Sequence, residues 1–465
     1  MYTINELNEL LDYINKIKQK EQHKKERGEV FTPLSIIIDN INKLNQIHIK
    51  TYKKSIFSEP NFKWLDPAAG IGNFSIIVYK LLMDGLITEI PNKETRRKHI
   101  LENMLYSIEL APENVFNYNK IFCGDKYKLN ICEGDSLNIN VINHFKLQDK
   151  FDVVIGNPPY NTHGTKHKGN KNTYVYFSKK ALTEWLKPSR YLAFIHPPVY
   201  RIPNHKIQHT KTNLNELYTS KKILFIKMYS IKETHKLMSV MMNVDFIILQ
   251  NISNDLIHKT NIIDVEDIEY DMQIKLNDFI PNFGLNIMKK IKDKSQHKNI
   301  ELKLTSELHA QHTKGSTYKN IHGIKKKGIK ICMSDKRHKY YDIPKLIING
   351  IGSYNYVFYD KNGEYGITQS PIGIINPSIN TLQFIQSSLF HYIANSTKII
   401  GNNFNIQTSL FLPIIPDDIK IKNVNDLYNY FKFSNDEITK INSFSIPIYK
   451  NNHLSCDGKT VLTEY

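Results

Sequence analysis

The sequence has few cysteines and no long apolar run. Its four cysteines (Cys123, Cys132, Cys332 and Cys456) are scattered, and this spacing predicts neither a disulfide framework nor a metal site. No apolar run approaches the ~20 residues of a membrane span, and residues 1–20 lack the apolar core of a signal peptide. We therefore expect an intracellular protein with no metal and no membrane partner.

Arginine is also scarce. Only six of the 62 basic residues are arginine, while the formal net charge is +17. A surplus of this size is typical of proteins that bind nucleic acids. The many lysines, isoleucines and asparagines are also what an AT-rich genome imposes on any protein. The charge therefore supports a polyanionic partner without establishing one.

The most informative stretch is a strand followed by a proline-rich loop. Residues 151–155 are mostly apolar and β-branched, which predicts a buried strand that Gly156 ends. The loop consists of Asn157, Pro158, Pro159 and Tyr160. Because prolines have no backbone N–H and hold the chain extended, the loop offers carbonyls and an amide side chain but few backbone donors. In open α/β sheets, loops after strands bind the ligands.

This loop suits the activation of a planar amine. Adenine N6 is a weak nucleophile because its lone pair is delocalised into the ring. The Asn157 side-chain oxygen and the Pro158 carbonyl would accept both amino hydrogens and localise that lone pair. Tyr160 would stack on the base. The alternative is an ordinary proline-rich turn with a tyrosine on the surface.

A second informative stretch covers residues 64–74. A short strand, a glycine turn led by Asp66 and an apolar helix over 75–82 resemble the opening unit of a dinucleotide-binding fold, without the third glycine of its phosphate cradle. A carboxylate there would repel a pyrophosphate but attract the ammonium and sulfonium groups of S-adenosylmethionine. The sequence therefore favours S-adenosylmethionine over NAD.

Acidic residues end the next two predicted strands, 105–109 and 129–135. Glu109 would accept from the ribose hydroxyls of the cofactor, and Asp135 from its adenine amino group. Each acid alone is more typical of a solvated strand end. Three acids at successive strand ends, followed by Asn157, together indicate one cofactor site. Further strands at 190–195, 222–229 and 240–249 make seven in total.

The ordered set of residues 28–33, 66–74, Glu109, Asp135 and 157–160 resembles the gamma-type DNA N6-adenine methyltransferases, the Asn-Pro-Pro-Tyr amino-methyltransferases of restriction-modification or phage type. The resemblance covers residues 24–250 and weakens beyond them. It implies cofactor-binding roles for Phe31, Thr32, Pro33, Asp66, Ala68, Gly70, Gly72, Asn73, Glu109, Asp135 and Asn157. The catalytic residues would be Asn157, Pro158, Pro159 and Tyr160.

Two positions depart from the family pattern. Ala69 replaces a frequent cysteine. The family's aromatic residue for the far face of the target base has no clear counterpart, since the region around Met238 offers methionines and Tyr229 lies upstream.

The resemblance implies an α/β fold: a seven-stranded Rossmann-like S-adenosylmethionine-dependent methyltransferase domain plus a C-terminal mixed α/β target-recognition domain. We place the catalytic domain at residues 1–255. It includes a helical entry over 1–45, in which Thr32 would cap a helix that has Pro33 in its first turn. A linker with one helix over 285–291 spans 256–300, the recognition domain spans 301–420 and a tail spans 421–465. In the recognition domain we predict a helix over 382–393.

The predicted activity is site-specific methylation of N6 of a flipped-out adenine in duplex DNA, with S-adenosyl-L-methionine as the donor. Basic residues interleaved with aromatics over 306–341 suit a nucleic-acid groove, although a solvated loop has the same composition. The absence of a nuclease motif leaves cleavage to a separate restriction endonuclease. We expect the cytoplasm of a prokaryote or of a virus- or phage-infected host cell. The alternatives are an rRNA adenine-N6 or protein glutamine-N5 methyltransferase and a non-catalytic DNA-specificity subunit.

Overall fold

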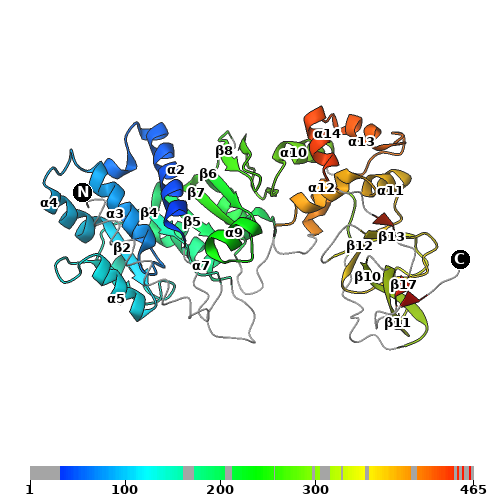
Figure 1. Cartoon of the computed structure of the whole chain (residues 1–465), viewed down its shortest axis with the longest axis horizontal. Coiled ribbons are helices and arrows are strands. Elements are labelled where there is room, and N and C mark those ends of the chain that lie inside the picture. Colours follow the sequence, from blue (N-terminus) through cyan, green and yellow to red (C-terminus); the bar gives the residue numbers. More distant parts are fainter. Residues whose placement is uncertain are drawn as a thin grey trace. The chain divides into compact units, whose positions relative to one another are not determined.

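The computed structural model divides the chain into two compact units, Met1–Phe279 and Ile280–Tyr465 (Figure 1). The structure describes residues 32–160, 172–204, 212–255, 257–295, 299–303, 315–325, 328–350, 356–399 and 406–444, and three short strands beyond them. Residues 1–31 of the predicted helical entry, including the predicted site residue Phe31, lie outside the described residues.

The first unit contains a nine-stranded, mostly parallel sheet in the order β3-β2-β1-β4-β5-β7-β6-β8-β9. Its strands are β1 (Trp64–Asp66), β2 (Leu105–Glu109), β3 (Asn130–Glu133), β4 (Phe151–Gly156), β5 (Leu186–His196), β6 (Lys221–Tyr229), β7 (Val244–Ser253), β8 (Thr260–Ile263) and β9 (Glu269–Met272). Strand β7 runs antiparallel to both β5 and β6. The predicted α/β class is confirmed, and β1–β7 are the seven strands expected.

Strands β8 and β9 extend the sheet through residues that the sequence analysis assigns to a linker. They are four residues long and pair antiparallel with each other, and β8 joins the edge at β6. In these two strands only Thr260 and Ile262 are buried, whereas the β9 side chains are exposed or half-buried. Such short, half-polar edge strands carry little of the hydrophobic alternation on which sequence assignment depends.

Helices and single turns connect the strands of the first unit. They are α2 (Leu34–Tyr52), α3 (Asn73–Gly85), α4 (Lys93–His99), α5 (Pro112–Ile121), α6 (Val141–His144), α7 (Thr173–Lys180), α8 (Leu214–Thr219) and α9 (Ile231–Met238). Two π-helical turns, η2 (Ile100–Met104) and η3 (Ala181–Trp185), lead directly into β2 and β5, and the 3₁₀ turns are η1 (Ile56–Ser58) and η4 (Pro198–Arg201). With β2 and β3 on one side of β1 and β5 and β6 on the other side of β4, the right-handed rule for such crossovers predicts that α3 and α5 cover one face and α7 and α8 the other.

Helix α2 begins one residue later than predicted. Pro33, not Thr32, occupies the cap position, and no side chain caps the helix. The helix packs on α3, and its His48 and Asn40 bond to Tyr191 of β5 and Tyr229 of β6. Thr32 is thereby free of the capping role and turns toward the strand ends described below.

Helix α8 fixes the end of the first unit. Asn215 Nδ2 donates to the Tyr200 carbonyl at 2.6 Å and to the Asp278 carbonyl at 2.8 Å. Thr219 Oγ1 accepts from the Asn277 backbone N–H at 3.0 Å. The last residues before the boundary at Phe279 are therefore bound to one short helix.

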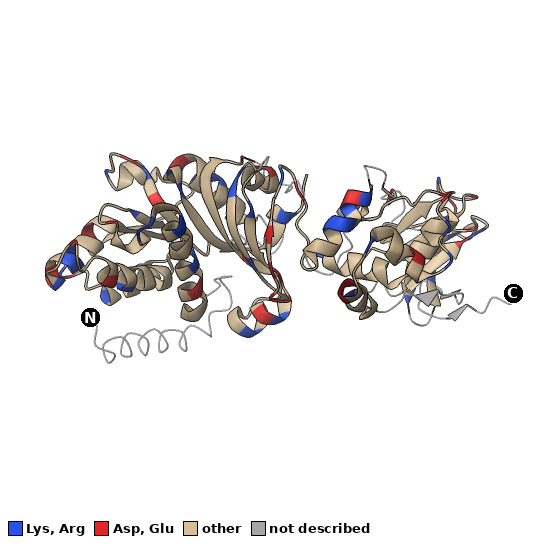
Figure 2. Ribbon diagram, turned by 90° about the horizontal axis from the view of Figure 1, so that it is seen from above, with Lys and Arg blue, Asp and Glu red and all other residues tan. Residues whose placement is uncertain are grey.

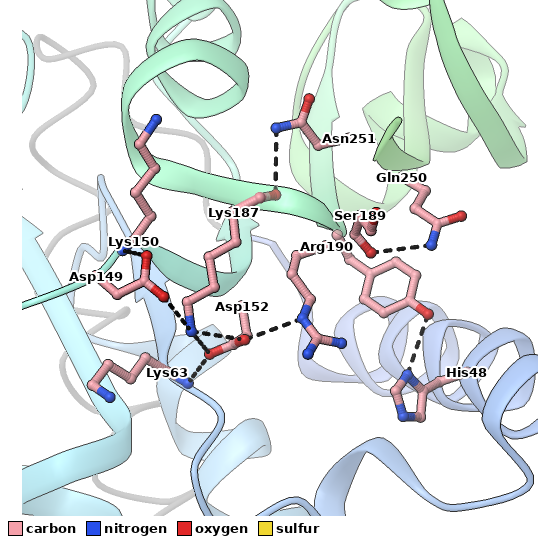
Figure 3. Close-up of polar contacts among 11 residues, drawn as sticks. His48, Lys63, Asp149, Lys150, Asp152, Lys187, Ser189, Arg190, Gln250 and Asn251 are labelled. Carbon is pink, nitrogen blue, oxygen red and sulfur yellow. Dashed lines mark hydrogen bonds and ion pairs between the residues drawn. The ribbon is translucent and has the colours of Figure 1, made fainter. Parts of the chain in front are cut away.

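A buried carboxylate organises the start of β4 (Figure 3). Asp152, 3% exposed, accepts from Lys187 Nζ at 3.1 Å on both oxygens, and the Arg190 Nε lies 3.2 Å from it. The β4–β5 register shifts between Phe151 and Val153, because residues 187–190 bulge out of β5. Asp152 therefore holds the two ends of this bulge. Its Oδ2 also accepts from the Lys63 backbone N–H at 3.0 Å, which ties the chain before β1 to the same point.

The second unit contains two small sheets and a set of helices. The sheets have the orders β14-β10-β11-β17-β18 and β15-β12-β13-β16. The strands are β10 (Tyr318–Lys325), β11 (Gly328–Ser334), β12 (Lys345–Asn349), β13 (Tyr356–Asp360), β14 (Gly366–Ile367), β15 (Pro371–Ile375), β16 (Ile448–Tyr449), β17 (His453–Leu454) and β18 (Thr460–Val461). The helices are α10 (Leu285–Ser295), α11 (Ile379–Ile385), α12 (Ser388–Ser396), η5 (Ile406–Phe411), α13 (Val424–Phe431) and α14 (Asn435–Asn442).

Three details of the second unit bear on the sequence predictions. The helix predicted over 382–393 is divided into α11 and α12, because Ser387 accepts from the Phe390 backbone N–H and caps a new helix. Cys332 of β11 is disulfide-bonded, which the cysteine spacing did not indicate. Lys345 and Asp360 form a fully buried ion pair at 2.6 Å between β12 and β13.

Within the described ranges, no helix combines the length and apolar character needed to cross a membrane. Over those same ranges, no three histidine, cysteine or acidic side chains gather as metal ligands would.

The Asp152 cluster generates a stability prediction. Asp152→Ala should lower the free energy of unfolding by about 2–3 kcal/mol, because it leaves two cations and a backbone N–H without their acceptor. The expected loss is smaller than the largest losses of stability seen when one partner of a fully buried ion pair is removed, since Lys187 and Arg190 remain 23% and 29% exposed. Asp149→Ala is the matched control. Asp149 pairs with the same Lys187 at 3.4 Å but is 68% exposed, so urea unfolding should show a loss under about 1 kcal/mol. Equal losses in both variants would contradict the prediction.

Candidate active site

Four strand ends converge at the carboxyl edge of the sheet in the first unit. Strand β1 pairs in parallel with β2 on one side and with β4 on the other, and β3 continues beyond β2. The chain order therefore reverses between β1 and β4, the kind of position at which open α/β sheets bind ligands. Asp66, Glu109 and Asn157 lie at or just past the ends of β1, β2 and β4.

Asp66 is a buried carboxylate with unused acceptor capacity. It is 3% exposed, and its Oδ1 accepts from the Ala68 backbone N–H at 3.2 Å. Its Oδ2 is buried and has no hydrogen-bond partner among the residues that the structure describes. Burial, with a smaller effect from Glu109, raises the pKa of Asp66 to about 8. An unpaired buried carboxyl of this kind is a site for a cation.

Gly156 brings the end of β4 directly against Asp66. Its φ is +150°, and a Cβ at this position would lie 2.7 Å from Asp66 Oδ1. A side chain at this position would have to displace the Asp66 carboxylate, and the positive φ itself favours glycine. The residue before the Asn157 loop is thus a glycine because the backbone passes so close to the carboxylate.

The glycine turn after β1 leaves an open space at the start of α3. Gly70 has φ +57°, and no atom lies within 4 Å of where its Cβ would stand. Gly72 has φ +94° at the cap of α3, where a Cβ would approach Tyr118 to 2.8 Å. The turn therefore needs both glycines for its backbone conformation, and only Gly70 borders free space.

Glu109 connects the turn after β1 to the turn after β2. It is 8% exposed, and its carboxylate accepts from the Gly70 N–H at 2.8 Å, the Ala111 N–H at 2.9 Å and Asn114 Nδ2 at 3.2 Å. A carboxylate has about four acceptor positions. Three are used, so one remains for a ligand.

Asp135 lies half-buried just past β3, and its loop joins the same edge. The Gly134 N–H donates to the Glu109 carbonyl at 2.9 Å, and Ser136 Oγ donates to the Pro67 carbonyl. Asp135 accepts from the Leu137 N–H at 2.9 Å and from Asn138 Nδ2 at 2.7 Å. Each of its two oxygens therefore keeps one acceptor position.

Thr32 bridges the two halves of the site. Asn157 Nδ2 donates to Thr32 Oγ1 at 3.0 Å, and Asn73 Nδ2 donates to the Thr32 carbonyl at 3.2 Å. Asn157 follows β4 and Asn73 begins α3. Thr32, which precedes α2, therefore contacts both. The resemblance predicts Thr32 as a cofactor-binding residue. Its bridging of Asn157 and Asn73 could not be predicted, because these contacts join residues 125 and 41 positions apart.

The rest of the loop is mostly buried. Pro158 and Tyr160 are buried and Pro159 is half-buried. The Tyr160 ring is 5% exposed and meets the Tyr174 ring edge-on, with centroids 6.3 Å apart. Burial raises the pKa of Tyr160 well above its usual value. The alternative of a surface tyrosine after an ordinary turn does not hold.

Part of this chain is similar to known proteins. Residues 86–232 match the family described as Eco57I restriction-modification methylase. An uncharacterized adenine-specific methylase of Mycoplasma pneumoniae is 27% identical over 248 residues, covering 38% of this chain and 57% of the relative. The chain thus spans a little over half of that relative's length. The resemblance predicted from the sequence is confirmed to this extent: residues 86–232 are similar to restriction-modification methylases, and the chain is a homologue of an adenine-specific methylase.

Among solved structures, a nuclease-deletion mutant of the Type ISP restriction-modification enzyme LlaGI, in complex with a DNA substrate mimic, is similar over 87% of this chain and 46% of its own. The TM-score is 0.51 and the identity is 13%. The Type IIL restriction-modification enzyme MmeI in complex with DNA covers 86% of this chain and 67% of its own, with a TM-score of 0.48 and 11% identity. The first of these similarities supports the fold.

The raised pKa of Asp66 predicts how stability depends on pH. Because the folded-state pKa of about 8 lies above the ordinary value of 3.8, the folded protein binds a proton between these pH values that the unfolded chain does not. Ionisation of Asp66 therefore reduces stability as pH rises through this window. Asp66→Asn removes the effect. Its stability relative to wild type, measured by urea unfolding without ligand, should increase by about 1.4 kcal/mol per pH unit from pH 5 to 8. Parallel pH profiles for the two proteins would refute the assignment.

Proposed function

We propose that this chain transfers a methyl group from S-adenosyl-L-methionine to N6 of a flipped-out adenine at a specific site in duplex DNA. The observation that carries the proposal is the contact between two half-sites. The Asp66 carboxylate borders Gly156, the residue before the proline loop, and Thr32 binds both Asn73 and Asn157. A cationic ligand at Asp66 and an amine at Asn157 would therefore be neighbours.

The residues around Asp66 fit the proposed cofactor. When bound, S-adenosylmethionine supplies a methyl group on a sulfonium. Asp66 Oδ2 would pair with its ammonium group, Gly70 would let the ligand approach the backbone, and the remaining acceptor position of Glu109 would take one ribose hydroxyl. Asp135 has acceptor positions left for an adenine amino group. Phe31, Thr32, Pro33, Ala68, Gly72 and Asn73 complete the proposed pocket.

The Asn157 loop would promote methyl transfer by orienting the N6 amino group. With Asn157 Nδ2 engaged by Thr32 Oγ1 at 3.0 Å, the amide orientation is set and its oxygen is directed away from that contact. This oxygen and the Pro158 carbonyl would accept the two N6 hydrogens and concentrate the lone pair on nitrogen. Pro159 and Tyr160 would hold these acceptors in place. The positioning of the amine against the methyl donor is then the main source of rate acceleration.

The second unit would bind and recognise DNA, with residues 301–420 as the target-recognition domain. Lys336, Arg337 and Lys339 are exposed in the loop between β11 and β12, and Tyr340 and Tyr341 follow them half-buried. Figure 2 shows basic residues distributed over both units. Such residues contact phosphates, while aromatic rings contact bases. A separate restriction endonuclease would cleave unmodified DNA.

The function is tested by mapping N6-methyladenine in DNA from cells that express the protein. We expect one methylated sequence context with the wild type and none with Asn157→Ala, because the loss of one transition-state contact costs about 100-fold or more. Asn362→Ala, at an exposed turn in the second unit, is the control and should methylate normally. If methyl groups are found only in rRNA or on protein glutamine, the substrate is not DNA, and the function is that of an rRNA adenine-N6 or protein glutamine-N5 methyltransferase.

The cofactor is tested by calorimetry with purified protein. Asp66→Asn should weaken S-adenosylmethionine binding about 10- to 100-fold, as expected for a lost charged hydrogen bond. Because a cation favours the ionised carboxylate and the free pKa is about 8, wild-type affinity should increase from pH 6 to 7.5. This range stays below the ~7.7–8.0 at which α-amino groups lose their proton. The variant should show no such increase, and an unchanged dissociation constant would remove Asp66 from the site.

A further inference from the structure

A closed ring of four buried residues lies behind the proline loop. Tyr174 of α7 stacks on His196 at the end of β5, with ring centroids 5.2 Å apart and planes 20° apart. His196 Nε2 lies 2.9 Å from the Tyr218 hydroxyl of α8, which lies 2.7 Å from Ser178 Oγ. Ser178 Oγ donates to the Tyr174 carbonyl at 2.8 Å and closes the ring. We call these four residues the α7 seat.

The α7 seat contacts the proline loop at two points. The Thr173 backbone N–H, at the first residue of α7, donates to the Tyr160 carbonyl at 3.2 Å. The Tyr174 ring meets the Tyr160 ring edge-on. The position of α7 therefore determines where the end of the loop lies.

The α7 seat is a buried cluster of uncharged polar side chains. His196, Tyr218 and Ser178 are all 0% exposed, and burial lowers the pKa of His196 to about 4, so its ring is neutral near neutral pH. A buried neutral hydrogen bond adds only ~1 kcal/mol net, and apolar residues of the same shape give similar stability. What a buried polar network adds is one defined arrangement of its side chains.

A second layer holds the α7 seat from the other side. The Tyr200 ring meets His196 edge-on, with centroids 5.6 Å apart, and the Tyr200 hydroxyl donates to Asp245 Oδ2 at 2.7 Å. Asp245 faces His196 in the β5–β7 register and pairs with the buried Arg201 at 3.0 Å. The imidazole is thus stacked on Tyr174 and met edge-on by Tyr200, and its Nδ1 lies 2.8 Å from the Pro197 carbonyl. A neutral ring has one N–H, so it donates at only one of its two nitrogens.

We infer that His196 and Tyr218 are positioning residues that act through α7 to hold the loop of residues 157–160 in its reactive conformation. Neither residue is assigned contact with cofactor or substrate. The kinetic part of this inference rests on the function proposed above, whereas its structural part does not.

The matched control is a second tyrosine–histidine pair on the same strand. Tyr191 of β5 is 1% exposed, and its hydroxyl lies 3.2 Å from His48 Nδ1. It precedes His196 by five residues, about 16 Å of extended strand away from the carboxyl edge. Tyr218→Phe and Tyr191→Phe therefore delete the same atom from equally buried pairs, but only the first pair lies behind the loop.

The first measurement needs no substrate. Hydrogen exchange of the Thr173 amide, followed by mass spectrometry in the full-length protein, should accelerate in Tyr218→Phe and His196→Phe. Exchange should stay at the wild-type rate in Tyr191→Phe. His196→Gln should remain close to wild type, because its amide can still bond to the Tyr218 hydroxyl. Thermal melts identify any variant that loses the fold, and Tyr191→Phe sets the loss expected from one buried hydroxyl. Unchanged Thr173 exchange in Tyr218→Phe would overturn the inference.

The second measurement is methyl transfer to DNA. Tyr218→Phe and His196→Phe should lower kcat about 10- to 100-fold, as small misplacements of reacting groups do. The KM for DNA and the affinity for S-adenosylmethionine should stay unchanged, and Tyr191→Phe should keep its kcat. Equal kcat values for Tyr218→Phe and Tyr191→Phe would also overturn the inference. A wild-type protein that methylates no DNA would count against the proposed function, and Thr173 exchange would then decide the inference alone.

Discussion

The site depends on one close approach, between the backbone at Gly156 and the carboxylate of Asp66. A Cβ at Gly156 would lie 2.7 Å from Asp66 Oδ1, so a side chain there would displace the carboxylate from its present position. The sheet topology makes β1 and β4 adjacent. Because Gly156 has no side chain, the turn after β1 and the loop after β4 can lie close together. Glu109 and Thr32 then add hydrogen bonds around that shared space.

The parts of the site that were predicted from sequence are those with a local cause. Asp66, Glu109 and Asn157 follow short apolar runs that read as strands, and the carboxyl ends of parallel strands meet at one edge. Thr32 was named through resemblance, but its bridging contacts were not foreseen. The α7 seat was missed entirely. Its Tyr218–Ser178 contact joins residues 40 positions apart, and nothing in the local pattern distinguishes these side chains from ordinary core residues.

The same limit explains the errors in the fold. Strands β8 and β9 are too short and too polar to give a period-2 signal. The division of residues 379–396 into two helices depends on one capping serine, Ser387, whose hydroxyl competes with helix continuation. By contrast, β4 is buried at all six positions, and its apolar run predicts a buried strand. Long, uniformly buried elements are the ones that sequence identifies.

The anchoring of residues 277 and 278 on α8 has a mechanical consequence. Asn215 and Thr219 hold the chain immediately before it leaves the first unit, and Tyr218 lies on the same helix turn. Any displacement of residues 277 and 278 would therefore act on α8, the helix whose Tyr218 hydroxyl contacts the His196 imidazole.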